Sequence, residues 1–393
     1  MRSKKLMLIF TILCLCGLTG CWDMVEINQL AIGSLIGGDI DPKSGNQIVY
    51  YQIVNPKAVT AQGGAGIKAP VYTYRVEASS IAELALKSSE SLPRDLFPDH
   101  YQSHLITERS ARQGLRPFLN FLERQFNRRT DLYLIITDSP LSDVMNTYTL
   151  LERLPGRSLR SLIELQSKSS GRVSRKCRVK DLVENMESSI LTVLPMVALQ
   201  TLKHASSTDR YEKINANGGE LRLSGGAVFK QDRMIGKLKL TQMPLYYLMK
   251  GEAKVFYDTV KLNSNNVDLR ATKIKVHKKL SYISGRPVWR LDIHAHLQIM
   301  SNEQQQKLTT KNLAEIKEAF NRQTAAKIND FFEQAQSKRW DLFGLEGQMK
   351  NKRGKEWAKA LQEKDFWRQT KLYCTINSKI TDIGEIIDPY RGN

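Results

Sequence analysis

The stretch Leu18-Thr19-Gly20-Cys21 is the part of this chain whose residue types and spacing point most directly to chemistry. It follows three basic residues and an apolar segment over 6–18. That segment is shorter than the roughly 20 apolar residues that span a bilayer, but it has the length of a signal-peptide core. We therefore predict a lipoprotein signal peptide over 1–20, cleavage between Gly20 and Cys21, and an S-diacylglyceryl group on Cys21, with or without an added N-acyl (palmitate) chain.

A secretory signal with a cysteine nearby by accident is the alternative. The lipid would be the chain's only membrane anchor, because no later segment has the length of a transmembrane run.

The formal net charge of +19 suits anionic lipid head groups or wall polymers, and an exported protein does not normally meet nucleic acid. The charge therefore favours an anionic membrane as partner, and a solvated basic surface with no partner is the alternative.

A second group of residues could bind a metal. Asp292, His294 and His296 fall on one face of a predicted strand, and alternate strand residues point the same way, as a zinc-binding His-x-His pair requires. The sequence offers no third and fourth ligand, and the solvated face of a half-buried strand explains the same pattern. We therefore predict no metal site.

Residues for catalysis are equally sparse. His100 and His104 lie near Glu108, but no nucleophile accompanies them, and the chain has neither a Gly-x-Ser-x-Gly elbow nor a phosphate-binding loop. We predict no catalytic residues, no cofactor and no enzymatic activity.

A disulfide between Cys177 and Cys374 is permitted outside the cell, although two buried free thiols are the favoured interpretation; their redox state stays open.

The elements that would carry these residues alternate between strands and helices in the first half. This pattern predicts an N-terminal α+β domain over 21–204, and a subdivision near 140–155 stays open. The polar stretch over 150–180 is either a small subdomain or a connection. The predicted strands and helices of this half cover 31–40, 47–54, 71–76, 81–92, 104–107, 114–126, 132–137 and 181–190.

The second half predicts a C-terminal α+β domain over 218–393. It opens with a hairpin and continues with alternating strands that predict a twisted antiparallel sheet, followed by a long amphipathic helix over 313–336. The predicted strands cover 221–229, 234–240, 255–262, 267–278, 288–300 and 372–376, and a short helix covers 244–250. The fold class is thus multi-domain α+β, with mixed or antiparallel sheets packed with helices.

Taken together, these residues resemble the Ger(x)C family, the C subunit of spore germinant receptors. The resemblance covers nearly all of the chain after the predicted signal peptide, except for a weak match over 150–215. Its motifs are Gly20-Cys21-Trp22-Asp23 with Glu26-Ile27-Asn28-Gln29-Leu30, Leu96-Phe97-Pro98-Asp99-His100 with Glu108 and Gly114, the hairpin over 225–238, and Asp341-Leu342-Phe343-Gly344 with Trp357.

The resemblance implies a non-enzymatic lipoprotein on the outer face of the inner spore membrane. It would assemble with membrane-embedded A and B receptor subunits and take part in nutrient-triggered germination. The family's fold consists of α+β domains, commonly described as three, and no ligand-binding residue is assigned. Two other classes stay open: a solute-binding lipoprotein of a transporter, and an exported hydrolase with His294 and His296 as metal ligands.

Overall fold

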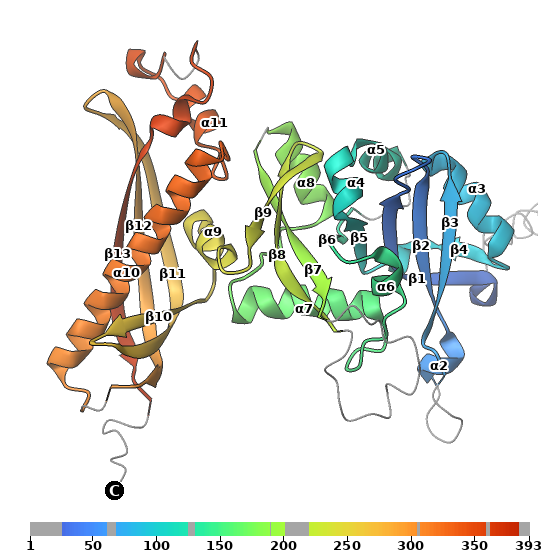
Figure 1. Ribbon diagram of the computed structural model, residues 1–393, viewed down its shortest axis with the longest axis horizontal. Helices are drawn as coiled ribbons and strands as arrows, with labels where there is room; N and C mark the ends of the chain where they lie inside the picture. Colours follow the sequence, from blue (N-terminus) through green and yellow to red (C-terminus); the bar gives the residue numbers. More distant parts are fainter. Residues whose placement is uncertain are drawn as a thin grey trace, which may run out of the picture.

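The computed structural model describes residues 26–60, 68–124, 130–188, 190–200, 220–304, 307–358 and 362–384. Figure 1 shows a large sheet and a small sheet at opposite ends of the long axis, with helix α9 (Met243–Lys250) between them. Both sheets pack with helices, so the predicted α+β class is confirmed. Within the described residues, no helix has the combination of length and apolarity needed to cross a bilayer.

The large sheet contains nine strands within the described part of the chain. The central strands β1, β5, β6 and β7 run parallel, and antiparallel strands flank them on both sides. The strand order is β3 (Val71–Ala78), β2 (Gln47–Val54), β1 (Leu30–Ile40), β5 (Ser103–Thr107), β6 (Tyr133–Thr137), β7 (Thr192–Leu199), β8 (Leu221–Lys230) and β9 (Arg233–Lys239), with β4 (Asp95–Phe97) beside β1.

Helices cover both faces of the large sheet. On one face, α3 packs on β3 and β2 and contacts α5, and on the opposite face Leu141 and Met145 of α6 lie against Gly37. The central strands are consequently buried on both sides, which explains their continuous apolar sequence. The helices of this region are α2 (Pro56–Thr60), α3 (Ile81–Ser91), α4 (Glu108–Gln113), α5 (Arg116–Arg124), α6 (Leu141–Met145), α7 (Pro155–Ser169) and α8 (Val179–Glu187), with short 3₁₀ turns η1 (Ile27–Gln29) and η2 (Pro98–His100).

The polar stretch over 150–180 contains a helix that the sequence did not predict. Helix α7 begins at Pro155, a favoured first helical residue, and packs on β1 and β5. A Cβ atom at Gly156 would lie 2.1 Å from the carbonyl oxygen of Ser34, so this close approach requires glycine. The stretch is therefore part of the body that covers the large sheet.

The small sheet has the order β10 (Phe256–Leu262), β11 (Asn265–Ile283), β12 (Arg286–Asn302) and β13 (Lys371–Asp382). The first three strands are antiparallel, as predicted, but β13 pairs parallel to β12, so the sheet is mixed. Helix α10 (Thr310–Ser337) packs on β10 and β13. The chain between α10 and β13 contains α11 (Leu345–Lys350), η4 (Lys355–Trp357) and η5 (Phe366–Gln369).

The predicted hairpin forms as β8 and β9, and it extends the large sheet through pairing of β8 with β7. Its apolar side chains continue into the core of the small sheet, where Leu238 and Met243 belong to the same buried cluster as Trp289. Gly236 of β9 lies so close to Trp340 that a Cβ atom there would be 2.1 Å from the indole ring. The hairpin end of the large sheet thus packs into the core of the small sheet, while the rest of the large sheet has its own buried clusters. The division into domains at 204–218 stays a prediction.

Candidate functional site

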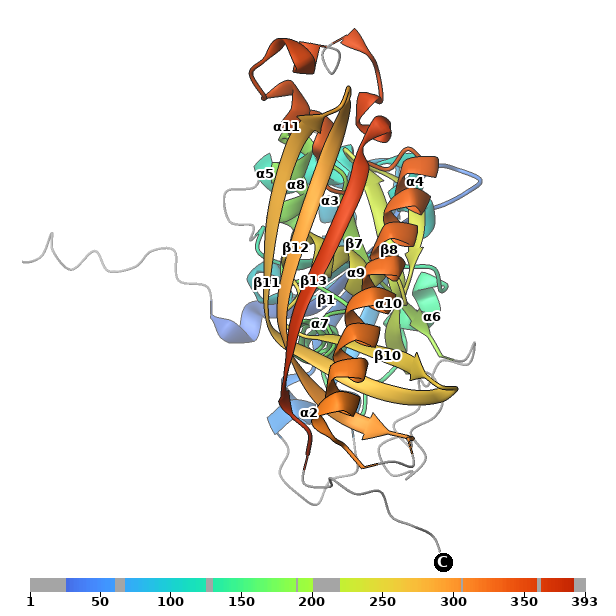
Figure 2. The same ribbon diagram turned by 90° about the vertical axis from the view of Figure 1, so that its left-hand side faces the viewer.

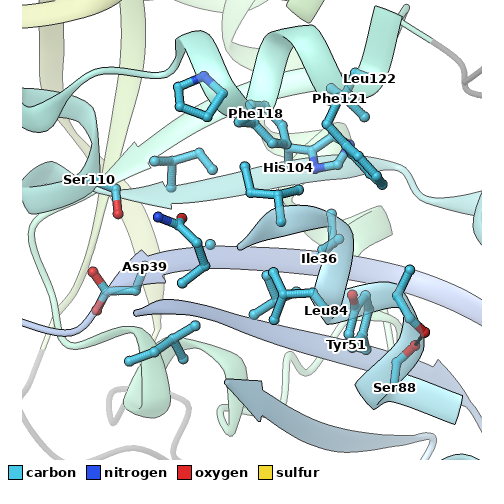
Figure 3. Close-up of a pocket in the computed structure, with 18 of the residues that line it drawn as sticks. Ile36, Asp39, Tyr51, Leu84, Ser88, His104, Ser110, Phe118, Phe121 and Leu122 are labelled. Atoms are coloured by element: carbon cyan, nitrogen blue, oxygen red, sulfur yellow. Dashed lines mark hydrogen bonds between the residues drawn. The ribbon is translucent and has the colours of Figure 1, made fainter. Parts of the chain in front are cut away.

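A cavity of about 1170 Å³ lies on the face of the large sheet that α3 and α5 cover. Figure 3 shows its lining: Ile36 and Asp39 lie on β1, Tyr51 on β2 and His104 on β5, and Leu84 and Phe118 come from the two helices. The turn between β8 and β9 lines one end with residues 230–233. The cavity thus combines an apolar floor with polar groups at its ends.

Helix α3 forms one wall because its start is well capped. The Ser80 hydroxyl accepts a hydrogen bond from the Glu83 backbone N–H, while the Glu83 carboxylate accepts from the N–H and hydroxyl of Ser79. Leu84 and Ser88 are the buried residues of the helix, and both line the cavity. The sequence predicted this helix, over 81–92.

Helix α5 forms the facing wall, and a residue 116 positions further along the chain holds its start. The carboxylate of Asp232 accepts a hydrogen bond from the Arg116 N–H at 3.2 Å, and its backbone carbonyl accepts from the Leu115 N–H at 2.9 Å. Gly114 precedes the helix at a φ of +123°, and a Cβ atom there would lie 2.7 Å from the Asp232 carboxylate. Sequence reasoning missed this contact, although Gly114 and Asp232 both belong to motifs that carry the family resemblance.

Asp39, at the edge of the cavity floor, is fixed by its neighbours. Its carboxylate accepts hydrogen bonds from the Thr107 hydroxyl at 2.5 Å and from Arg109, whose guanidinium approaches to 2.5 Å. The Asp232 carboxylate likewise accepts a hydrogen bond, from the Arg116 N–H at the start of α5. Both carboxylates therefore serve to hold the walls of the cavity, and an acid–base role would require these contacts to break.

His100, His104 and Glu108, which lie near one another in the sequence, have different surroundings in the structure. His104 is buried, with its ring 5.2 Å from that of Phe118, while His100 is exposed beside Phe97. Burial acts to raise the pKa of the Glu108 carboxyl, but Lys237 and Arg112 outweigh it, so the pKa lies below its ordinary value. Glu108 is thus a charged partner that links α4 to β9 through the 2.5 Å contact with Lys237.

Asp292, His294 and His296 lie together on the side of β12 that faces away from the core. The intervening residues Leu291 and Ile293 are buried, so the solvated-strand interpretation agrees with the structure. Within the described ranges, no group of three His, Cys, Asp or Glu side chains could hold a metal. His294 instead lies beside His277 of β11, with ring centroids 5.9 Å apart.

The cysteines divide into two groups. Residues 1–25, which include Gly20 and Cys21, lie outside the described residues, so lipidation and cleavage stay predictions. Cys177 and Cys374 are free, the first buried and the second half-buried. Burial raises the pKa of both thiols, that of Cys374 to about 12, so neither has the lowered pKa that is typical of reactive cysteines.

Comparison with known proteins places this geometry in a family. The model of the spore germination protein N-terminal domain matches residues 23–199, and the model of the spore germination B3/GerAC-like C-terminal domain matches 224–384. The chain belongs to the GerAC family of spore germination proteins. The expected membership of the Ger(x)C family, named for the same C subunits, is therefore confirmed.

Relatives of the GerAC family are similar to this chain at low identity. Spore germination protein KC of Bacillus subtilis (strain 168) is 24% identical over 384 residues, which cover 93% of this chain and 91% of that protein. Spore germination protein A3 of the same organism is 22% identical over 230 residues, covering 58% of this chain and 55% of that protein. The crystal structure of the GerBC protein superposes with a TM-score of 0.56 at 15% identity, covering 91% of this chain and all of that one, so it is similar in fold.

The GerAC motifs meet in the folded chain, which gives them a structural role. Gly114 of the first half contacts Asp232 of the hairpin, and Gly236 of the hairpin contacts Trp340, one residue before the last motif. In that motif, the Asp341 carboxylate accepts hydrogen bonds from the Leu345 and Glu346 N–H groups at the start of α11. The hairpin therefore contacts both neighbours and joins the two sheets.

Proposed function

We propose that this protein is the lipid-anchored C subunit of a spore germinant receptor and acts without catalysis in nutrient-triggered germination. Its partners would be membrane-embedded A and B subunits, and its place the outer face of the inner spore membrane. The match of both GerAC family models, one to each half of the chain, is the observation that carries the proposal. The partners, the anchor and the location are what the family resemblance implies.

The physical role of the anchor is confinement. Cys21 is five residues before Glu26, so a lipid on its thiol would lie within about 18 Å of the first described residue. Such a tether raises the effective concentration of the folded body next to membrane partners. The large sheet, which begins at Leu30, would then lie close to the membrane surface.

The cavity does not by itself favour recognition of a nutrient. Its volume of about 1170 Å³ is slightly above the roughly 300–1,000 Å³ of pockets that enclose drug-sized ligands. Its walls are held by fixed contacts of Asp39 and Asp232, and both halves of the chain match models of spore germination proteins. A solute-binding lipoprotein of a transporter is accordingly the less favoured function.

Replacement of the anchoring thiol tests the proposal. Spores carrying Cys21→Ser should lose the protein from the membrane fraction and germinate poorly in response to nutrients, while the unfolding temperature of the folded body is unchanged. Cys374→Ser is the matched control, because it removes a half-buried thiol outside the predicted lipidation site and should leave germination intact. Full nutrient germination with Cys21→Ser protein in the soluble fraction would refute the anchor.

A further inference from the structure

The small sheet has one side that no described helix covers. Helix α10 packs on the inner side, and Figure 2 shows β11, β12 and β13 side by side with α10 beside them. We define the outer face as the outward side chains of the central part of these three strands: Lys275, His277 and Lys279 of β11, alternate residues 290–296 of β12, and alternate residues 371–379 of β13. It contains the Asp292, His294 and His296 group whose chemistry the function does not use.

The outer face carries an excess of positive charge. Strand pairing places Lys279 beside Arg290, Lys275 beside His294, and Lys379 beside His296. Asp292 is the one carboxylate among the outer-face residues. Five cations project from this face, and none of them forms an ion pair with another described residue: Lys275, Lys279, Arg290, Lys371 and Lys379.

The composition of the outer face selects the kind of partner. Lysine is depleted in the cores of protein–protein interfaces, and single-stranded nucleic acids are bound by rows of exposed aromatic residues, of which this face has only Tyr373. Clustered lysines near a membrane attract anionic lipids. Tyr373, whose ring lies 4.9 Å from the Lys371 ammonium, has the amphipathic side chain that is enriched at the level of lipid head groups.

We propose that the outer face of the small sheet binds the anionic head groups of a phospholipid bilayer. This contact lies at the opposite end of the long axis from β1, beside which the lipid on Cys21 would be attached (Figure 1).

The test uses protein that lacks residues 1–20 and carries Cys21→Ser, so that neither leader nor lipid contributes. Co-sedimentation should show binding to vesicles of phosphatidylglycerol and phosphatidylcholine in equal parts and none to phosphatidylcholine alone. The triple variant Lys275→Gln/Lys279→Gln/Lys379→Gln should weaken binding on the order of a hundredfold, since each cation near an anionic surface contributes roughly fivefold, the equivalent of about 1 kcal/mol. Equal binding to both kinds of vesicle would overturn the proposal.

Matched variants show whether binding depends on where the lysines lie or only on the net charge of the protein. Lys43→Gln/Lys168→Gln/Lys180→Gln removes three exposed lysines of the large-sheet region and should weaken binding far less, whereas Lys275→Arg/Lys279→Arg/Lys379→Arg should keep it. Equal losses in the two glutamine variants would reject the outer face as the site. Preference for single-stranded nucleic acid over anionic vesicles at the same ionic strength would also reject it. Because the protein tested carries no lipid, these outcomes are independent of the Cys21→Ser germination test.

Discussion

The central strands of the large sheet and the long strands of the small sheet differ in what surrounds them. Every residue of β5 and β6 is buried, because helices lie on both faces of the large sheet. Along β12, buried residues alternate with exposed or half-buried ones from Leu291 to Leu297, because helix α10 covers one face only. Sequence periodicity is therefore lost where both faces are covered and retained where one is open.

The two regions also use charge differently. In the large sheet, carboxylates are committed to nearby partners: Asp39 binds Arg109, and Glu108 binds Lys237. On the outer face of the small sheet, the cations have no ion-pair partner among the described residues. Charged side chains thus fix the internal geometry at one end of the molecule and leave a surface available for binding at the other.

Alanine substitutions of neighbouring residues should show the largest contrast. Leu134→Ala and Ile135→Ala should each reduce the free energy of unfolding by about 2–5 kcal/mol, since both side chains are fully buried on opposite faces of β6. In β12, Ile293→Ala should cost a similar amount, whereas His294→Ala should stay within about 0.5 kcal/mol of the wild type. Urea unfolding measures all four values.

Two outcomes would contradict this contrast. A small effect of either large-sheet substitution would mean that one face of β6 is not packed as described. A large effect of His294→Ala would mean that the outer face is covered in the protein as it exists.

The contact that joins the two sheets should give the next largest effect. Gly236→Ala places a methyl group against the Trp340 ring and should cost about 1–3 kcal/mol in unfolding free energy, because the ring or the strand must shift. In the double variant Gly236→Ala/Trp340→Ala, the methyl group has room, so the double cost should be less than the sum of the single costs. Strict additivity would show that the two residues do not contact each other.

The sequence predicted most of the elements because their local patterns are strong. The alternation in β12, the helix α3 and the apolar stripe of α10 depend on neighbours within a few residues, so each element was predicted with bounds close to those observed. Helix α7 was missed because its sequence is polar, with burial on a narrow side that includes Gly156 and Leu159.

The candidate site could not be predicted, because its walls depend on long-range contacts. Asp232 and Arg116 are 116 positions apart, and no local pattern indicates that a hairpin turn caps a helix at that distance. The parallel pairing of β13 with β12 is likewise a long-range property, since α10 and the segment after it separate the two strands in the sequence. Gly114 was the available signal, because glycine is the residue that adopts a positive φ without strain.

Removal of that long-range cap should have a moderate effect. Asp232→Ala deletes the acceptor for the Arg116 N–H at the start of α5 and should lower the unfolding free energy by about 0.5–2 kcal/mol. Asp232→Asn keeps an oxygen acceptor and should recover most of this loss. Equal losses in both variants would assign the effect to the charge of Asp232 beside Arg116.

The smallest effect should come from the ion pair of Glu108 with Lys237, which is partly exposed. The folded-state pKa of Glu108 lies below its ordinary value, so the carboxylate stabilises the fold above the unfolded-state pKa of about 4.3. This contribution is lost as the pH falls through the folded-state pKa. Glu108→Gln should therefore cost less than about 1 kcal/mol at pH 7 and approach no cost in strong acid.

On the outer face, Lys279→Gln should give no such pH-dependent loss, because Lys279 forms no ion pair with a described residue. Matching pH profiles for the two variants would mean that charge is used alike in both sheets.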